Sequence, residues 1–207
     1  MIQFPEATKV HRRLPKEAFY QHLPITNALK DRFVSDVDRI YLEWSLTKDS
    51  LHLEKDSRIK EILVLLIELK RQDFDSKILE AIARQNPHEL IFLLSFSNER
   101  QLAVYHGKLY RSKWEPKEEI ELSARGFSID EIMDSLIEQI AITEESDGGA
   151  DLSIDERLAR QEKIEKLQKQ IDKTEAAAWK EQQPKKKFEL YSRAQEYRKK
   201  LEEIKHG

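Results

Sequence analysis

The sequence predicts an α/β fold: a mixed β-sheet with flanking helices, followed by a C-terminal antiparallel α-helical hairpin. Two short apolar runs, at residues 62–67 and 90–94, are rich in Ile, Leu and Val, which is typical of central strands covered on both faces. A helical pattern at 74–85 separates them, which predicts a β-α-β unit with parallel strands. Beyond residue 153 the apolar residues adopt the 3-4 spacing of a helical seam.

The front of the chain is expected to begin with a lead-in segment, residues 9–23, that ends in a short helix. Pro15 suits the first turn of that helix, because proline has no N–H to leave unpaired. Thr26 can cap the next helix, at 27–38, in which apolar residues recur every four positions. Apolar and polar residues then alternate over 39–47, which predicts a strand.

The remaining elements of the α/β domain are separated by Asn, Gly, Asp and Pro at turns. Helical segments among them have one apolar side, whereas strands are short apolar runs. In chain order we expect a short strand at 51–53, the central strand at 59–70, a helix at 74–85, a strand at 89–96, two antiparallel strands at 101–105 and 109–114, and a helix capped by Ser128 at 129–140.

The predicted domains are an α/β domain at 1–143, an acidic flexible linker at 144–152 and a helical hairpin at 153–207. The hairpin has a narrow apolar seam, so we expect it to need the main domain, a second copy or another protein to complete its apolar face. A homodimer is one way to achieve this. The predicted interface residues are Ile164, Leu167, Ile171, Leu190, Tyr197 and Leu201.

Composition argues against several classes of protein. Residues 151–207 hold 15 Lys and Arg against 12 Asp and Glu, so with a total of −3 the first 150 residues carry −6. Such a balance disfavours a protein that wraps duplex DNA. The chain has no cysteine, and its six histidines lack the spacing of a helical metal clamp. It has no signal-peptide pattern and no apolar run near the ~20 residues that span a bilayer. We expect a cytoplasmic protein with no cofactor and no membrane contact.

The end of the central strand offers one candidate for catalysis. Glu68 and Lys70 are similar to the E-x-K half of the PD-(D/E)xK nucleases, in which two acidic groups bind Mg²⁺ and the lysine activates water. Asp56 or Asp49 could supply the second carboxylate, so Asp56 and Glu68 would be the metal ligands. The Pro-Asp pair of that motif is missing. The alternative is that Glu68 and Lys70 are only the polar exit of a buried strand.

The C-terminal region offers a weak nucleic-acid candidate. Basic side chains near the hairpin turn could contact phosphates, and Trp179 or Tyr191 could stack on a base. The alternative is that these lysines only solvate the turn. The basic residues concerned are Lys185, Lys186, Lys187 and Arg193.

Several phrases of the sequence resemble a bacterial family of domains of unknown function, number four-three-nine-one of its series. They include Leu14-Pro-Lys-Glu-Ala-Phe-Tyr20, Leu66-Ile-Glu-Leu-Lys-Arg-Gln-Asp-Phe-Asp75 and Gln183-Pro-Lys-Lys-Lys-Phe-Glu-Leu190. Genes of this family are found beside those of helicases, adenine-specific DNA methyltransferases and type III-like restriction subunits. The resemblance covers nearly the whole chain, implies a restriction or antiphage role with partners of these kinds, and carries no catalytic residues. We therefore expect an accessory subunit that docks on larger partners through the hairpin.

Overall fold

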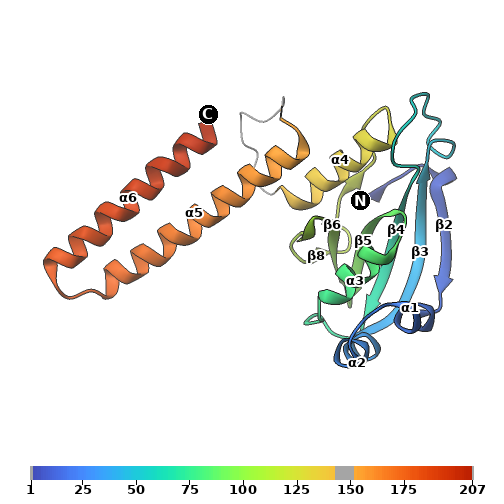
Figure 1. The fold of residues 1–207 in the computed structure, drawn as a ribbon, viewed down its shortest axis with the longest axis horizontal. Coiled ribbons are helices and arrows are strands. Elements are labelled where there is room, and N and C mark those ends of the chain that lie inside the picture. Colours follow the sequence, from blue (N-terminus) through green and yellow to red (C-terminus); the bar gives the residue numbers. More distant parts are fainter. Residues whose placement is uncertain (1, 143–151, 207) are drawn as a thin grey trace. The chain divides into compact units, whose positions relative to one another are not determined.

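The computed structural model describes residues 2–142 and 152–206, and it confirms the predicted fold class. The chain divides into two compact units, Met1–Ala141 and Ile142–Gly207, shown in Figure 1. The first is an α/β unit and the second a helical hairpin. All of the predicted linker except Leu152 lies outside the described residues.

A seven-stranded mixed sheet forms the centre of the α/β unit, in the order β2-β3-β4-β5-β6-β7, with β8 paired to β6. Among the described strand pairs of this main sheet, only β4 and β5 are parallel, as the predicted β-α-β unit requires. A second, two-stranded sheet pairs β1 (Ile2–Gln3) with β9 (Leu122–Ser123). The strands of the main sheet are β2 (Lys9–Leu14), β3 (Val37–Thr47), β4 (Glu61–Leu69), β5 (Glu89–Phe96), β6 (Glu99–His106), β7 (Lys108–Arg111) and β8 (Glu115–Pro116).

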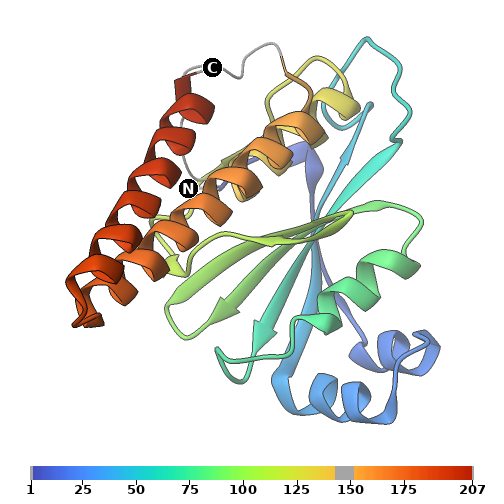
Figure 2. The ribbon, with the colours of Figure 1, turned by 60° about the vertical axis from the view of Figure 1, so that its left-hand side comes forward.

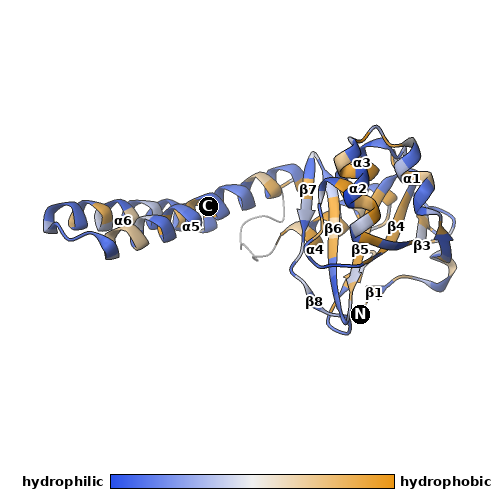
Figure 3. Cartoon of the chain, turned by 90° about the horizontal axis from the view of Figure 1, so that it is seen from below, coloured by the Kyte–Doolittle hydropathy of each residue, from blue (hydrophilic) through white to orange (hydrophobic). Residues whose placement is uncertain are grey.

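Helices cover both faces of the main sheet (Figure 2). On one face, Leu65 and Ile67 of β4 pack with Phe33 and Ile78 in a single buried cluster. On the other face, α4 contacts β4 and β6 and buries one apolar side. Apolar colouring accordingly concentrates on the central strands and on α4 in Figure 3. The helices of this unit are α1 (Lys16–His22), α2 (Asn27–Asp36), α3 (Lys77–Gln85) and α4 (Ile129–Ala141), with a 3-10 turn at Glu6–Thr8.

Several predicted elements need correction. The expected strand at 51–53 is a series of turns, because the Ser50 hydroxyl bonds to the backbone of Thr47 and of Ser45. The lead-in segment contains β2, an edge strand of the main sheet. Nearly all side chains of β2 are exposed, so the sequence shows no apolar pattern that would predict it. The helix expected at 74–85 begins at Lys77, whereas Thr26 does cap α2 by accepting from the Leu29 N–H.

A carboxylate in the first turn of α4 fixes the loop that precedes β4. Asp130 accepts hydrogen bonds from the backbone N–H groups of Arg58 and Ile59, at 2.9 and 3.0 Å. These bonds, that of Ile59 foremost, hold the pKa of Asp130 below its ordinary value of 3.8. Ser57 adds a third link by accepting from the N–H of Ile129. The loop is therefore attached to α4 on two sides.

Asp130→Ala should lower the free energy of unfolding by about 1 kcal/mol at pH 7, since the hydrogen bonds are partly solvated. Because the folded-state pKa is the lower one, the stabilisation is complete above the ordinary value and is lost as pH falls through the folded-state value. Urea unfolding at pH 7 and pH 3 should show the difference shrinking at the lower pH. Asp31→Ala, at an exposed position of α2, is the control. An equal loss at both pH values would contradict the prediction.

The second unit consists of α5 (Ile154–Lys180) and α6 (Pro184–His206), which pack closely. Ser153 starts α5 with a capping box, in which its side chain accepts from the Glu156 N–H and Glu156 bonds back to the Ser153 N–H. Near the other end of the pair, Arg198 and Glu175 form an ion pair at 2.6 Å. None of the described helices is long and apolar enough to cross a membrane.

Candidate functional site

The structure sends Glu68 and Lys70 to different partners. The Glu68 carboxylate lies 3.6 Å from Arg39, its neighbour across the β3–β4 ladder, and the side chain is 37% exposed. Lys70 follows the strand and donates from Nζ to the carbonyl of Val34, at 3.0 Å, near the C-terminal end of α2. A lysine at this end of a helix satisfies a carbonyl and complements the helix dipole. Both groups therefore have structural contacts.

The predicted nuclease residues do not converge. Asp56 and Asp49 lie in the loop before Glu61, the first residue of β4, whereas Glu68 lies near the other end of that strand, about 23 Å from Glu61 at ~3.3 Å per residue. Asp56 is 89% exposed and bonds to Lys48 at 2.7 Å, which lowers its pKa. No group of three or more metal-ligating side chains occurs among residues 2–142 and 152–206. The structure thus separates Asp56 from Glu68 and Lys70, contrary to the nuclease hypothesis.

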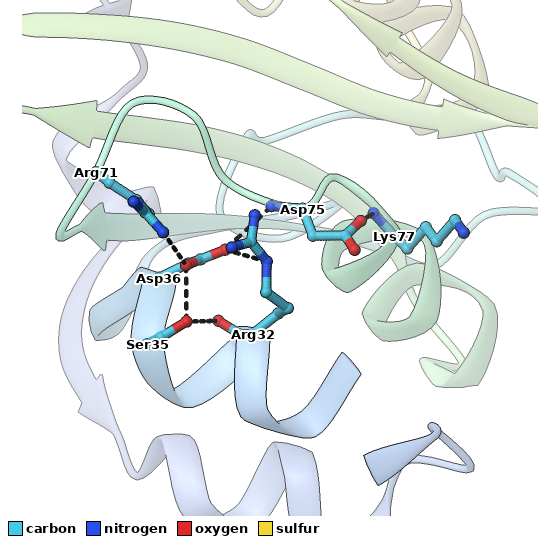
Figure 4. Close-up of polar contacts among 6 residues, drawn as sticks. All are labelled: Arg32, Ser35, Asp36, Arg71, Asp75 and Lys77. Atoms are coloured by element: carbon cyan, nitrogen blue, oxygen red, sulfur yellow. Dashed lines mark hydrogen bonds and ion pairs between the residues drawn. The ribbon is translucent and has the colours of Figure 1, made fainter. Parts of the chain in front are cut away.

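A fully buried carboxylate lies beside Lys70, and no sequence pattern predicted it. Asp36, the last residue of α2, has no exposed surface. Its oxygens accept from the Ser35 hydroxyl at 2.8 Å and from the Asp75 N–H at 3.2 Å. Two half-exposed arginines approach it, Arg32 at 3.4 Å and Arg71 at 3.8 Å (Figure 4). This cluster, hereafter the Asp36 cluster, joins the end of α2 to the segment between β4 and α3.

A groove of about 630 Å³ runs between α2 and α3 next to the Asp36 cluster. Ala28 and Ala81 belong to its lining, and small side chains leave open space between the helices. Two of its cations are already engaged: Arg32 by Asp36, and Arg84 by Glu80 at 3.9 Å. Lys77 is a third cation of the lining, and the Asp36 cluster holds the end of α2 against the segment before α3.

The predicted interface residues divide into two groups. Ile164, Ile171 and Leu201 are 3%, 3% and 6% exposed, and they pack on one another between α5 and α6. Leu167 and Tyr197 are partly buried against this cluster, and Leu190 is half-buried. The first three therefore close the hairpin itself. Whether any of the six meets a partner stays a prediction, with the partly buried group the more accessible.

Aromatic and basic side chains gather around the turn of the hairpin. Trp179, near the end of α5, is 77% exposed, and Phe188, in the first part of α6, is 73% exposed. The Lys187 ammonium lies 5.9 Å from the centre of the Trp179 ring, and Lys185 and Lys186 are exposed. We call these five residues the hairpin tip.

Phe188 was not among the predicted site residues, although its position in α6 could have predicted its exposure. It lies off the seam positions of α6, so an amphipathic helix gives it no place to pack. Tyr191, which the sequence suggested as a stacking residue, is only 37% exposed. Arg193 is exposed on α6. An aromatic residue off the seam and next to a lysine run is the pattern that would have identified Phe188.

Comparisons with known proteins bear on the family and not on the activity. No curated protein and no solved structure matches the chain. A family model described as Domain of unknown function (DUF4391) matches residues 2–201. Because this match covers nearly all of the 207 residues, the chain belongs to the DUF4391 family.

Proposed function

We propose that this protein is a non-catalytic accessory subunit that docks on a protein partner through the tip of its C-terminal hairpin. The observation that carries the proposal is the exposure of Trp179 and Phe188, at 77% and 73%. Large exposed aromatic side chains mark interaction surfaces, and tryptophan is enriched among the residues that dominate binding energy. A partner that covers both rings would remove their apolar surface from water.

The seam supports this choice of surface by being occupied. Ile164, Ile171 and Leu201 bury one another, so they stabilise the pair of helices and leave little apolar area for docking. A partner can reach the side chains around the turn without opening the hairpin. Leu190, half-buried and two residues beyond Phe188, would extend the contact.

The charge of the tip favours an acidic partner surface. Between residues 179 and 193 the chain carries five basic and two acidic side chains, so the local balance is +3. Complementary charge accelerates association and excludes like-charged competitors. The sequence resembles a family whose genes are found beside those of helicases and DNA methyltransferases. Proteins of these two kinds are therefore the candidate partners, and the complex would act in a restriction or antiphage system in the cytoplasm.

Co-expression with a helicase or a DNA methyltransferase, the partners that the resemblance implies, tests the proposal. The full-length protein should co-purify with one of them, and Trp179→Ala with Phe188→Ala should lower the recovered partner at least about tenfold, since interface aromatics typically contribute 2 kcal/mol or more. Phe127→Ala is a matched control, because Phe127 is 76% exposed but belongs to the α/β unit. Equal recovery with the tip variant, or an equal loss with the control, would contradict docking through the tip.

Weak binding of single-stranded nucleic acid is the second candidate function. It is favoured by the same tip, in which Lys187 lies over the Trp179 ring and two more lysines follow the turn. Bases can stack on exposed rings while lysines contact phosphates. This alternative requires that a labelled oligonucleotide bind more weakly as salt rises. Binding of the protein partner, with no salt-dependent binding of the oligonucleotide, would favour the accessory subunit.

The Mg²⁺-dependent nuclease gains no support, because Asp56 precedes β4 whereas Glu68 lies near the far end of that strand.

A further inference from the structure

A cavity of about 400 Å³ lies over the middle of the main sheet. Leu66 and Leu93 line it, and they are direct neighbours in the parallel register of β4 and β5. Trp44 of β3 and the buried Ile120 add further apolar surface. The volume falls at the lower end of the range for small-molecule sites, which are mainly apolar with a few polar groups. The cavity can therefore hold the apolar part of a small molecule.

Arg100 belongs to the lining of this cavity. Its Nε is buried and has no hydrogen-bond partner among the described residues. Burial lowers the pKa of the guanidinium, and the charges of Glu43 and Glu118 act in the opposite direction. The guanidinium stays protonated even so, because arginine loses its proton only far above neutral pH. Because the Nε atom has no accessible surface, a ligand in the cavity would meet the guanidinium through its two terminal nitrogens.

The other charged groups of the lining favour a ligand with a single negative charge. Lys9, Lys117 and Arg100 contribute three positive charges, and Glu43 and Glu118 contribute two negative ones, so the lining has a balance of +1. A monoanion would neutralise it. A more highly charged anion would be repelled by the two carboxylates.

Glu43 also has a partner outside the lining of the cavity. Its carboxylate lies 2.9 Å from the Nδ1 atom of His11, whose ring stacks on Tyr41. His11 has a φ of +46° where the β2–β3 register shifts. His11 and Glu43 therefore form a pair that joins β2 to β3.

We propose that this cavity binds a small organic carboxylate, whose apolar body lies on Leu66 and Leu93 and whose carboxylate accepts a hydrogen bond from Arg100. Lys9 and Lys117 supply the remaining positive field. The site is independent of the hairpin tip, so it would give the α/β unit a ligand-responsive role that docking through the tip does not require.

Titration of the full-length protein with 3-phenylpropanoate, followed by backbone amide NMR spectra, tests the assignment, and 3-phenylpropanamide is the neutral comparison. The carboxylate should shift the amide signals of Leu66, Leu93 and Arg100 and should bind about tenfold more tightly than the amide, the effect of one charged hydrogen bond. Arg100→Gln should remove that preference. Arg84→Gln, in the groove between α2 and α3, should leave it unchanged.

Lys117→Gln is the second variant, because its side chain lies on an exposed segment and its loss should not disturb the sheet. It should weaken carboxylate binding about threefold through the lost field. Equal affinity for the carboxylate and the amide would overturn the proposal, as would no binding at millimolar concentration, or shifts confined to α5 and α6. If Arg100→Gln does not give a folded spectrum, full affinity in Lys117→Gln overturns it.

Discussion

Asp36→Ala should lower the free energy of unfolding of the α/β unit by about 2–4 kcal/mol. Asp36 has no exposed surface, and its removal would leave the Asp75 N–H without its acceptor, whereas the Ser35 hydroxyl would keep the Arg32 carbonyl. Hydrogen bonds to a charged group each contribute about 1.5–3 kcal/mol, and breaking a buried ion pair adds to the loss. Arg32 and Arg71 are half-exposed, so they can turn to water, which keeps the estimate below the full cost of a buried unpaired charge.

Urea unfolding monitored by tryptophan fluorescence at pH 7 measures this effect. Asp38→Ala is the matched control, because Asp38 is two residues away, 47% exposed, and paired only with its neighbour Arg39 among the described contacts. The control should stay within about 0.5 kcal/mol of the parent. A change of the same size in both variants would show that the Asp36 cluster does not stabilise the unit.

Ile171→Asp should unfold the hairpin and leave the α/β unit folded. Ile171 is 3% exposed and packs with Ile164 and Leu201, and a carboxylate placed there loses its hydration without gaining a partner, at a cost of several kcal/mol. Long helices with a narrow apolar stripe depend on such packing for most of their stability. The apolar cluster between α5 and α6 is small, so its remaining contacts cannot compensate for the lost stability.

Circular dichroism at 222 nm measures this result. α5 and α6 have 27 and 23 residues, whereas α1 to α4 have 7, 10, 9 and 13, so the helical signal should fall by about half. Lys173→Asp changes charge at an exposed position two residues away and should keep the signal. A retained helical signal in Ile171→Asp would mean that contacts beyond the seam stabilise the hairpin.

Apolar periodicity was sufficient to predict the central part of the fold. The apolar runs in β4 and β5 are buried on both faces of the sheet, so nearly every side chain there is apolar and predicts a central strand. It failed for β2, whose sequence Lys-Val-His-Arg-Arg-Leu lies on an open edge and buries almost nothing. It also failed for β1 and β9, because two-residue strands are too short to show a period.

The candidate sites were harder to predict because they depend on distances between segments. Glu68-x-Lys70 could be read from the sequence, but its distance from Asp56 follows from the length of β4. Asp36 looked like one of many charged residues, since only the approach of Arg71 and Asp75 from the next loop reveals its burial. Arg100 is similar, because the burial of its Nε depends on the segments that pack around it and not on its neighbours in sequence.

The two open edges of the main sheet both carry positive charge. β2 presents Lys9, Arg12 and Arg13 on one edge, and β7 has Lys108 and Arg111 on the other. Unpaired strand edges invite aggregation by templating new strands, and like charges repel an approaching copy of the same edge. The basic edges should therefore keep concentrated protein from forming fibrils or precipitating, and this protection would weaken at high ionic strength.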